Sequence, residues 1–280
     1  MESIASLLKS TEIPMMESDL SCEICPNCGT KQIMVLEILG RSRKVHVRCQ
    51  CKSEIYEQER KDERQKQQQH RLERLRSYSL MDEKFRHCTF ENWNRTKENE
   101  KLYRLGKKYC DEWSRLKSEN VGLLLWGPPG TGKTYLSSCI ANTLLEELIP
   151  VIAISSIGIL NRIKSTYGSY GQEGEVEIIN SMKNAALLVL DDLGAENNTE
   201  WSQEKLYEMI DSRYRLEKPM IVTTNLSLQQ LKNKLTGRDG VSRTYDRLME
   251  MCIPVEVQDT SKRAEAGRGK TMLLRSLLQE

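Results

Sequence analysis

The sequence lacks any apolar run of the roughly 20 residues that a membrane-spanning helix needs. The segment Met1–Ser10 also lacks the basic start and the following apolar stretch of a secretory signal, since its second residue is acidic. The sequence also lacks an excess of one sign of charge, since 42 Lys and Arg stand against 40 Asp and Glu. The resulting formal net charge of +2 is too small to indicate a nucleic-acid partner by itself. These absences favour a cytoplasmic protein with no membrane partner.

The composition fits one substantial domain and a small accessory module. Of the 280 residues, 38% are apolar and 29% are charged, which is typical of a globular protein. Residues 41–76 hold 12 Lys and Arg against 6 Asp and Glu, and this basic tract could attract DNA or be a solvated linker. We expect an N-terminal module over 1–55, a charged helical linker over 56–84 and a larger domain over 85–280.

Five of the nine cysteines fall within Cys22–Cys51, and clustered cysteines in a cytosolic protein indicate a metal site. Two short clusters supply the four soft ligands of a tetrahedral Zn²⁺ site: Cys25, Cys28, Cys49 and Cys51. Cys22 or His46 could replace one of these ligands, and buried free cysteines are the alternative. Apolar stretches at 33–39 and 45–47 suit the strands of a zinc ribbon, which is too small to fold without its metal.

Apolar runs alternate with helical stretches beyond Asn120. Four runs are predicted to be buried strands: Val121–Trp126, Val151–Ile154, Ala186–Leu190 and Met220–Thr223. Such alternation is typical of an α/β fold in which helices flank a parallel sheet. A helix around Glu98–Leu116 is expected before the first of these strands.

A phosphate-binding loop follows the first strand. The eight residues are Gly127, Pro128, Pro129, Gly130, Thr131, Gly132, Lys133 and Thr134. The glycines let successive N–H groups face one anion, and the next helix adds its positive N-terminal end, so ATP fits here. We expect Lys133 to reach the β and γ phosphates and Thr134 to join a Mg²⁺ coordination sphere. A glycine-rich turn without a ligand is the alternative.

Polar residues follow two further strands at the positions that ATP hydrolysis requires. Asp191 is expected to hold Mg²⁺, and Asp192 to polarise the attacking water. Asn225, after the next strand, can orient that water between the acidic residues and the γ phosphate. The alternative is that these residues only serve turns.

These motifs, in this order, resemble the helicase-loader branch of AAA+ ATPases, the DnaC/DnaI type, which also includes IstB-type transposition helpers. The resemblance covers Phe85 to Arg263. Its specific marks are Thr89-Phe90-Glu91-Asn92-Trp93, Leu190-Asp191-Asp192-Leu193-Gly194, Thr224-Asn225-Leu226 and Ser242-Arg243-Thr244-Tyr245-Asp246-Arg247-Leu248. The resemblance implies an AAA+ P-loop core without a full C-terminal lid, as the chain ends soon after Arg247.

The resemblance also implies residues that act between subunits of a homo-oligomer. In that branch an arginine enters the neighbouring nucleotide site and neutralises transition-state charge. Arg247 is the first choice for this role and Arg243 the second, while a surface helix that pairs its arginines with Asp239 or Asp246 is the alternative. Arg263 is similar to the family's second nucleotide sensor.

Cations and tyrosines are mixed after the second strand. Arg162, Lys164 and Tyr167 combine groups that contact phosphates and stack on unpaired bases. Initiators and loaders bear an extra helix at this place, which the segment resembles. A solvated amphipathic face is an equal alternative.

The resemblance implies an ATPase that loads a DnaB-type replicative helicase onto single-stranded DNA through its N-terminal module, with slow turnover that DNA or the partner regulates. An IstB-like transposition helper that binds target DNA is the nearest alternative. A zinc-bearing DNA-binding adaptor that binds ATP without hydrolysing it is another. The short chain also suggests a phage or mobile-element replication protein.

Overall fold

The computed structural model describes residues 24–38, 41–167 and 174–258, and six residues beyond 266. The chain divides into two compact units, Met1–Gln68 and Gln69–Glu280. Within the described ranges, no helix is both long enough and apolar enough to cross a bilayer. The expected absence of a C-terminal lid concerns the residues after 258, and most of these lie outside the described residues.

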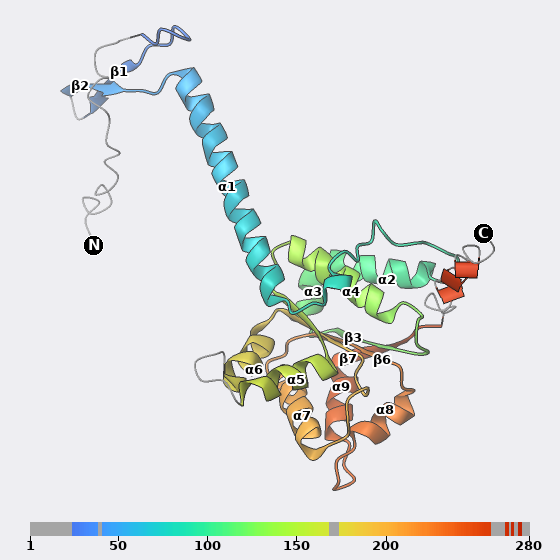
Figure 1. The fold of residues 1–280 in the computed structure, drawn as a ribbon. Helices are drawn as coiled ribbons and strands as arrows, with labels where there is room; N and C mark the ends of the chain where they lie inside the picture. Colours follow the sequence, from blue (N-terminus) through green and yellow to red (C-terminus); the bar gives the residue numbers. More distant parts are fainter. Residues whose placement is uncertain are drawn as a thin grey trace, which may run out of the picture. The chain divides into compact units, whose positions relative to one another are not determined.

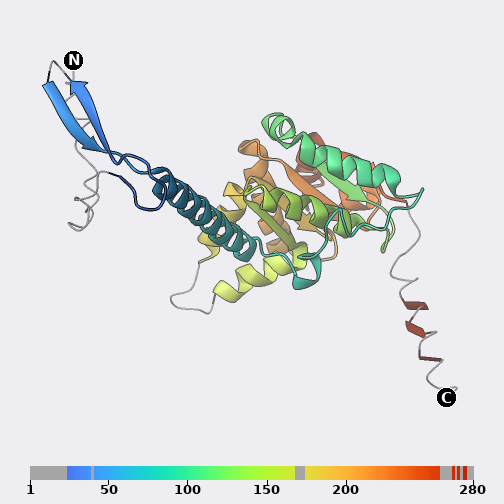
Figure 2. The ribbon, with the colours of Figure 1, turned by 90° about the horizontal axis from the view of Figure 1, so that it is seen from above.

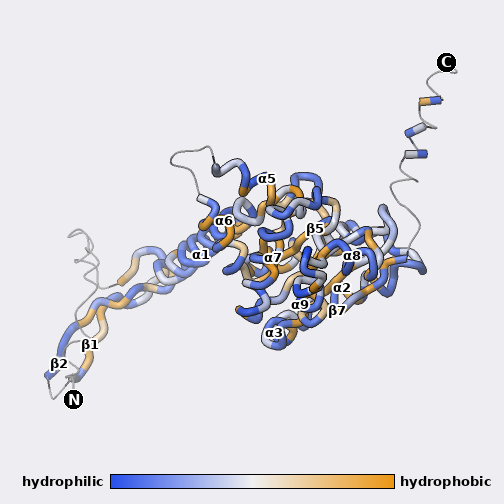
Figure 3. The backbone as a smooth tube through the Cα atoms, turned by 90° about the horizontal axis from the view of Figure 1, so that it is seen from below, coloured by the Kyte–Doolittle hydropathy of each residue, from blue (hydrophilic) through white to orange (hydrophobic). Residues whose placement is uncertain are grey.

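The first unit contains a hairpin of two antiparallel strands, β1 (Ile33–Ile38) and β2 (Arg41–His46), in which Ile33 pairs with His46. The second strand begins earlier than predicted because its first residues are polar and all six are exposed, so no apolar pattern marks them. Figure 3 shows the contrast between hydrophobic β1 and hydrophilic β2. Backbone pairing with β1, and not burial, therefore holds β2.

The charged stretch forms a helix, α1 (Gln50–Tyr78), and none of its residues is buried. Spacing of four residues lets Gln58 donate to Asp62 at 2.9 Å on the exposed surface. Near its end, Leu72 and Leu75 pack against the core of the second unit. Figure 3 shows the hydrophilic character of most of this helix.

The second unit is built on a five-stranded parallel sheet in the order β4-β5-β6-β3-β7. Its strands are β3 (Gly122–Trp126), β4 (Val151–Ser155), β5 (Leu187–Asp191), β6 (Met220–Thr224) and β7 (Cys252–Glu256). The first four lie within one residue of their predicted positions. The fifth went unpredicted because it is an edge strand that contains Pro254 and has mostly exposed residues.

Helices cover both faces of this sheet (Figures 1 and 2). One face carries α2 (Glu100–Asp111), α3 (Trp113–Ser118) and α4 (Lys133–Glu146). The other carries α5 (Ser156–Thr166), α6 (Glu175–Asn184), α7 (Glu200–Arg215), α8 (Leu228–Leu235) and α9 (Arg243–Met251). Alternating strand residues serve the two faces: Leu123 and Leu125 join one core and Leu124 the other. The prediction of an α/β AAA+ core is confirmed, although the helix expected over 98–116 is divided at Glu112.

Arg213 on α7 is fully buried in this unit. Its guanidinium donates to the carbonyl oxygens of Met182 (3.0 Å), Ala185 (2.7 Å), Ala186 (3.4 Å) and Pro219. Burial lowers its pKa to about 10, since no carboxylate offsets the lost hydration. The charge lies at the negative C-terminal end of α6 and ties this helix to the start of β6.

Candidate nucleotide-binding site

The loop between β3 and α4 curls through three glycines with positive φ. Gly127 has φ 140°, Gly130 86° and Gly132 97°, conformations that L side chains rarely adopt. Gly127 also passes close to another strand end, because a Cβ there would lie 2.5 Å from the carbonyl oxygen of Val257. The curled loop thus ends at the N-terminus of α4, with Gly132 as the N-cap. Backbone N–H groups at a helix N-terminus are a typical anion-binding site.

Lys133 is the first residue of α4 and is buried, although it is charged. Its ammonium donates to the carbonyl oxygens of Gly127 (2.8 Å) and Pro128 (2.7 Å). These two acceptors hold the cation against the loop, where phosphate oxygens can compete for it. The predicted phosphate-binding lysine therefore lies where an anion in the loop would meet it.

A cavity of about 250 Å³ opens at this loop and joins residues from distant parts of the chain. The loop and α4 contribute Gly130, Gly132, Lys133, Thr134 and Tyr135, and two strand ends contribute Asp192 and Asn225. The segment before α2 adds Lys84, Phe85, Asn92, Trp93 and Asn94. The predicted phosphate loop, acidic residue and sensor amide thus share one cavity.

Asp191 and Thr134 line a second, smaller cavity of about 20 Å³ beside the first. The Thr223 hydroxyl donates to the Asp191 carboxylate at 2.6 Å and fixes its orientation. A hydroxyl and a carboxylate are the hard oxygen ligands that Mg²⁺ prefers. The residues present fit the predicted magnesium site.

Asp192 adopts a left-handed conformation, with φ 51°, directly after β5. Its N–H donates to the Thr223 hydroxyl at 3.0 Å, and its carboxylate accepts from the Asn225 amide at 3.1 Å. The two adjacent carboxylates therefore line different cavities. Asp191 lines the smaller cavity, and Asp192 lines the larger one with Asn225.

An aromatic wall of the cavity was not predicted. Tyr135 donates its hydroxyl to the Asn92 carbonyl at 3.1 Å, and its ring meets that of Trp93 at a centroid distance of 5.3 Å. Lys84 and Phe85 extend this wall. In the sequence, Asn92 and Trp93 served only as marks of the family resemblance. Their positions in the sequence do not predict a contact with Tyr135, the residue after the phosphate loop.

The two candidate arginines differ in their surroundings. Arg247 forms an ion pair with Asp211, and its guanidinium lies 5.1 Å and 5.4 Å from the ring centroids of Tyr207 and Tyr214. Arg243 is 57% exposed, pairs with Asp239 and lines an open cavity of about 600 Å³. Arg263 lies outside the described residues.

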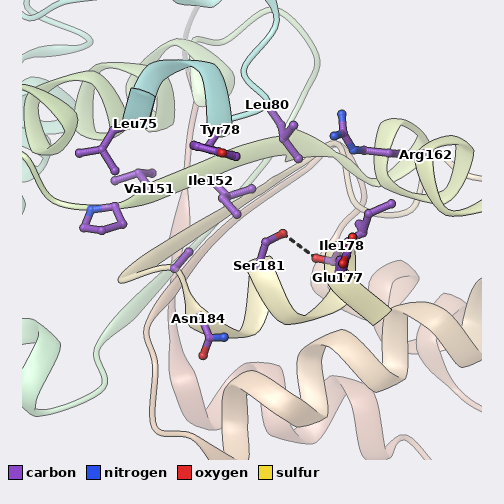
Figure 4. A pocket seen from close by; sticks show the side chains of 12 residues that line it. Leu75, Tyr78, Leu80, Val151, Ile152, Arg162, Glu177, Ile178, Ser181 and Asn184 are labelled. Atoms are coloured by element: carbon purple, nitrogen blue, oxygen red, sulfur yellow. Dashed lines mark hydrogen bonds between the residues drawn. The ribbon is translucent and has the colours of Figure 1, made fainter. Parts of the chain in front are cut away.

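The structure brings together two of the three candidate DNA contacts. The Lys164 ammonium lies 4.8 Å from the Trp201 ring centroid, and the Trp201 indole donates to the Tyr167 hydroxyl at 3.2 Å. Arg162 instead lines a cavity of about 290 Å³ formed with the end of α1, β4 and α6 (Figure 4). Trp201 on α7 was not predicted, because only tertiary folding brings it to α5.

The four predicted zinc ligands lie together: the Sγ atoms of Cys25, Cys28, Cys49 and Cys51 are all within 4.8 Å of one another. Zn–S bonds of about 2.3 Å in a tetrahedron require S···S separations of about 3.8 Å, which this cluster fits. Hydrogen bonding with Thr30 is the main cause that lowers the pKa of Cys28 to about 5, while Cys49 is the main cause that raises the pKa of Cys51 to about 12. His46 is exposed, and Cys22 lies outside the described residues.

This sheet order, with a phosphate loop after β3 and acidic residues after β5, defines an AAA+ ATP-binding protein. The chain belongs to the family described as IstB-like ATP binding protein, whose profile matches residues 51–269. It is 26% identical over 162 residues to the replicative helicase loader DnaC of Escherichia coli, covering 58% of this chain and 62% of that protein. It is 25% identical over 169 residues to the loader of the same name from Buchnera aphidicola subsp. Baizongia pistaciae, covering 60% and 68%.

Two solved structures share the fold. A crystal structure of the DnaC helicase loader superposes with a TM-score of 0.53 at 22% identity, covering 63% of this chain and 100% of that one. A crystal structure of DnaI gives a TM-score of 0.53 at 22% identity, covering 65% and 94%. The resemblance to the DnaC/DnaI and IstB branch is thus confirmed.

Proposed function

We propose that this protein is an ATPase that loads a DnaB-type replicative hexameric helicase onto single-stranded DNA. The observation that carries the loader assignment is the similarity to proteins named replicative helicase loaders, at 25% identity over 169 residues and 26% identity over 162 residues. The cavity that joins Lys133, Asp192 and Asn225 supports the hydrolytic part.

The residues of the cavity divide the work of hydrolysis. Lys133 exchanges the carbonyls of Gly127 and Pro128 for phosphate oxygens. Thr134 and Asp191 would hold Mg²⁺, which would neutralise phosphate charge. Asp192 accepts a proton from the attacking water, and the Asn225 amide keeps its carboxylate directed at the γ-phosphate end of the cavity.

Assembly of a homo-oligomer completes the site with an arginine from the next subunit. Arg247 remains our first choice, and its pairing with Asp211 holds it until the neighbour's phosphates compete for the guanidinium. Arg243, which is far more exposed, is the second choice. Arg263 is proposed as a sensor acting from the same chain.

DNA contact is assigned to the outer face of α5. Lys164 supplies charge and Tyr167 an exposed ring, and Trp201 beside them offers a further surface on which an unpaired base can stack. Arg162 adds a phosphate contact from a separate part of the same helix.

The cysteine module is proposed as the zinc-held adaptor that binds the helicase. Its exposed strand β1 presents Met34, Val35 and Leu36, which are 53%, 58% and 41% exposed. Successive strand residues point to opposite faces, so Met34 and Leu36 share one exposed apolar face and Val35 lies on the other, and exposed apolar faces are typical of interaction surfaces. We keep the proposed limits of 1–55 for this module, 56–84 for the linker and 85–280 for the ATPase domain.

The transposition helper is the second candidate, because the family that matches this chain is described as IstB-like. The ATP-binding core permits both functions almost equally, whereas the cysteine module argues against the transposition helper. The adaptor that binds ATP without hydrolysing it is the third candidate, and measured phosphate release that Lys133→Ala abolishes would exclude it.

A pull-down of the host's DnaB-type helicase by the full chain tests the loader assignment. We expect capture by the wild type, loss of capture by the double variant Cys25→Ser/Cys28→Ser, and retained capture by His46→Ala, whose exposed side chain lies in the same module. No capture by the wild type, with single-stranded DNA binding intact, would favour the transposition helper.

A further inference from the structure

A short 3₁₀ turn, η3 (Glu83–Phe85), lies against the nucleotide cavity. Lys84 and Phe85 line this cavity together with Lys133 and Asp192. The turn belongs neither to the phosphate loop nor to the strand ends that carry the acidic residues. It comes from the segment between α1 and the aromatic lead-in, which is separated from the loop by more than one helix in the sequence.

Helix α4 fixes the position of this turn. The Asn142 amide donates to the carbonyl oxygens of Phe85 (2.9 Å) and Cys88 (2.8 Å). Asn142 is buried and lies on the helix that begins at Lys133. The turn and the phosphate-binding lysine are therefore anchored to one rigid element.

The turn also reaches the magnesium end of the site. Met81, Asp82 and Phe85 line the smaller cavity together with Thr134 and Asp191. Phe85 thus lines both cavities. Lys84, directly before it, lines the larger cavity together with Gly130, Gly132 and Lys133 of the phosphate loop.

The charge of Lys84 is available for an anion. In the described part of the chain its ammonium has no ion pair, and it lies 5.8 Å from the centroid of the Phe85 ring. Two of the neighbouring charges pair with each other, since Arg86 lies 2.9 Å from Glu83. In the proposed function, Mg²⁺ and the next subunit's arginine meet part of the charge of a bound triphosphate, and Lys84 is a further cation beside Lys133 in the lining of this cavity.

We propose that Lys84 binds the phosphates of the nucleotide from outside the phosphate loop, so that nucleotide binding acts directly on the segment that follows α1. Only four residues separate η3 from the last residue of α1, and one of them, Ser79, accepts a hydrogen bond from the Ala153 N–H of β4 at 2.7 Å. This role deepens the proposed function, since it requires that the cavity bind ATP.

Fluorescent ATP binding to the full-length chain, with Mg²⁺, tests this role. We expect Lys84→Ala to weaken binding about tenfold and Lys84→Arg to stay within about threefold of the wild type, because one charge-assisted contact is lost in the first and kept in the second. Arg86→Ala, in the same segment but outside the cavity lining, is the matched control and should bind as the wild type does.

Amine-reactive footprinting of the wild type gives a second readout that needs no substitution. Saturating ATP should slow acylation of Lys84 while exposed Lys97 reacts at an unchanged rate. Wild-type binding that Lys84→Ala retains in full, or Lys84 labelling that ATP does not alter, would overturn this role alone. A wild-type chain that binds no nucleotide would overturn the proposed function as well.

Discussion

The guanidinium of Arg247 on α9 forms an ion pair with the carboxylate of Asp211 on α7, and two tyrosine rings flank it. The other oxygen of the same carboxylate accepts from Arg215 at 2.8 Å. Only 22% of the Arg247 side chain is exposed. To act on a neighbouring subunit, Arg247 must therefore break a mostly buried ion pair with Asp211. Arg243 would only have to break an exposed ion pair with Asp239.

Arg247→Ala and Arg243→Ala should differ in two measurements. We expect Arg247→Ala to lower the free energy of unfolding by about 1–2 kcal/mol, since it leaves Asp211 with one partner fewer in a mostly buried place. Arg243→Ala should leave stability unchanged. Whichever substitution lowers ATP turnover about 100-fold or more identifies the catalytic arginine.

Mixing subunits shows whether that arginine acts in trans. Arg247→Ala subunits keep an intact phosphate loop, and Lys133→Ala subunits keep the arginine. If Arg247 acts on the neighbouring site, the mixture regains turnover that neither variant has alone. A mixture as inactive as its components would remove Arg247 from this role.

Asp192 and Asn225 are predicted to act on hydrolysis more than on binding. Asp192→Asn should lower turnover by about 100-fold or more while fluorescent ATP still binds, because the phosphates are held by the loop and Lys133. Asn225→Ala should lower turnover less, since the carboxylate remains but loses the amide that orients it. Equal losses in ATP affinity and turnover for both variants would contradict this division.

The cysteine cluster should bind a single zinc ion through four thiolates. Elemental analysis of the purified chain should find zinc in the wild type and in His46→Ala, but little in Cys28→Ser or Cys51→Ser. Retained zinc in both cysteine variants would mean that another residue completes the site. All four tryptophans lie in the second unit, so chelation should leave the unfolding of that unit, followed by tryptophan fluorescence, unchanged.

Much of the fold could be predicted because its signals are local. Buried strands appear as apolar runs, and the phosphate loop is one unbroken stretch of eight residues. The edge strand β7 could not be found in this way, because Pro254 and exposed side chains hide it. The contact of Trp93 with Tyr135 and the pairing of Arg247 with Asp211 arise only when separate elements pack together, so no sequence spacing reveals them.

Contact with single-stranded DNA is predicted to depend on the group formed by Lys164, Tyr167 and Trp201. Trp201→Ala should weaken binding of an oligonucleotide about fivefold or more, as expected for loss of one stacked base. Lys164→Ala should weaken it and reduce its salt dependence. Trp113→Phe, a buried ring on the opposite face of the sheet, is the control. Unchanged affinity of Trp201→Ala and Lys164→Ala for the oligonucleotide would show that this group only packs at the surface and does not bind DNA.

The buried guanidinium of Arg213 is predicted to be essential for stability. Arg213→Met keeps much of the side-chain volume but leaves the carbonyls of Met182, Ala185 and Pro219 without their donor in a site closed to water. Each buried acceptor that loses its partner costs about 1–3 kcal/mol, so a total loss of about 3 kcal/mol or more is expected. Arg215→Met, on the same helix but 69% exposed, should cost only a few tenths of a kcal/mol. Urea unfolding followed by tryptophan fluorescence measures both, and a similar small loss in the two variants would mean that the end of α6 is held by packing alone.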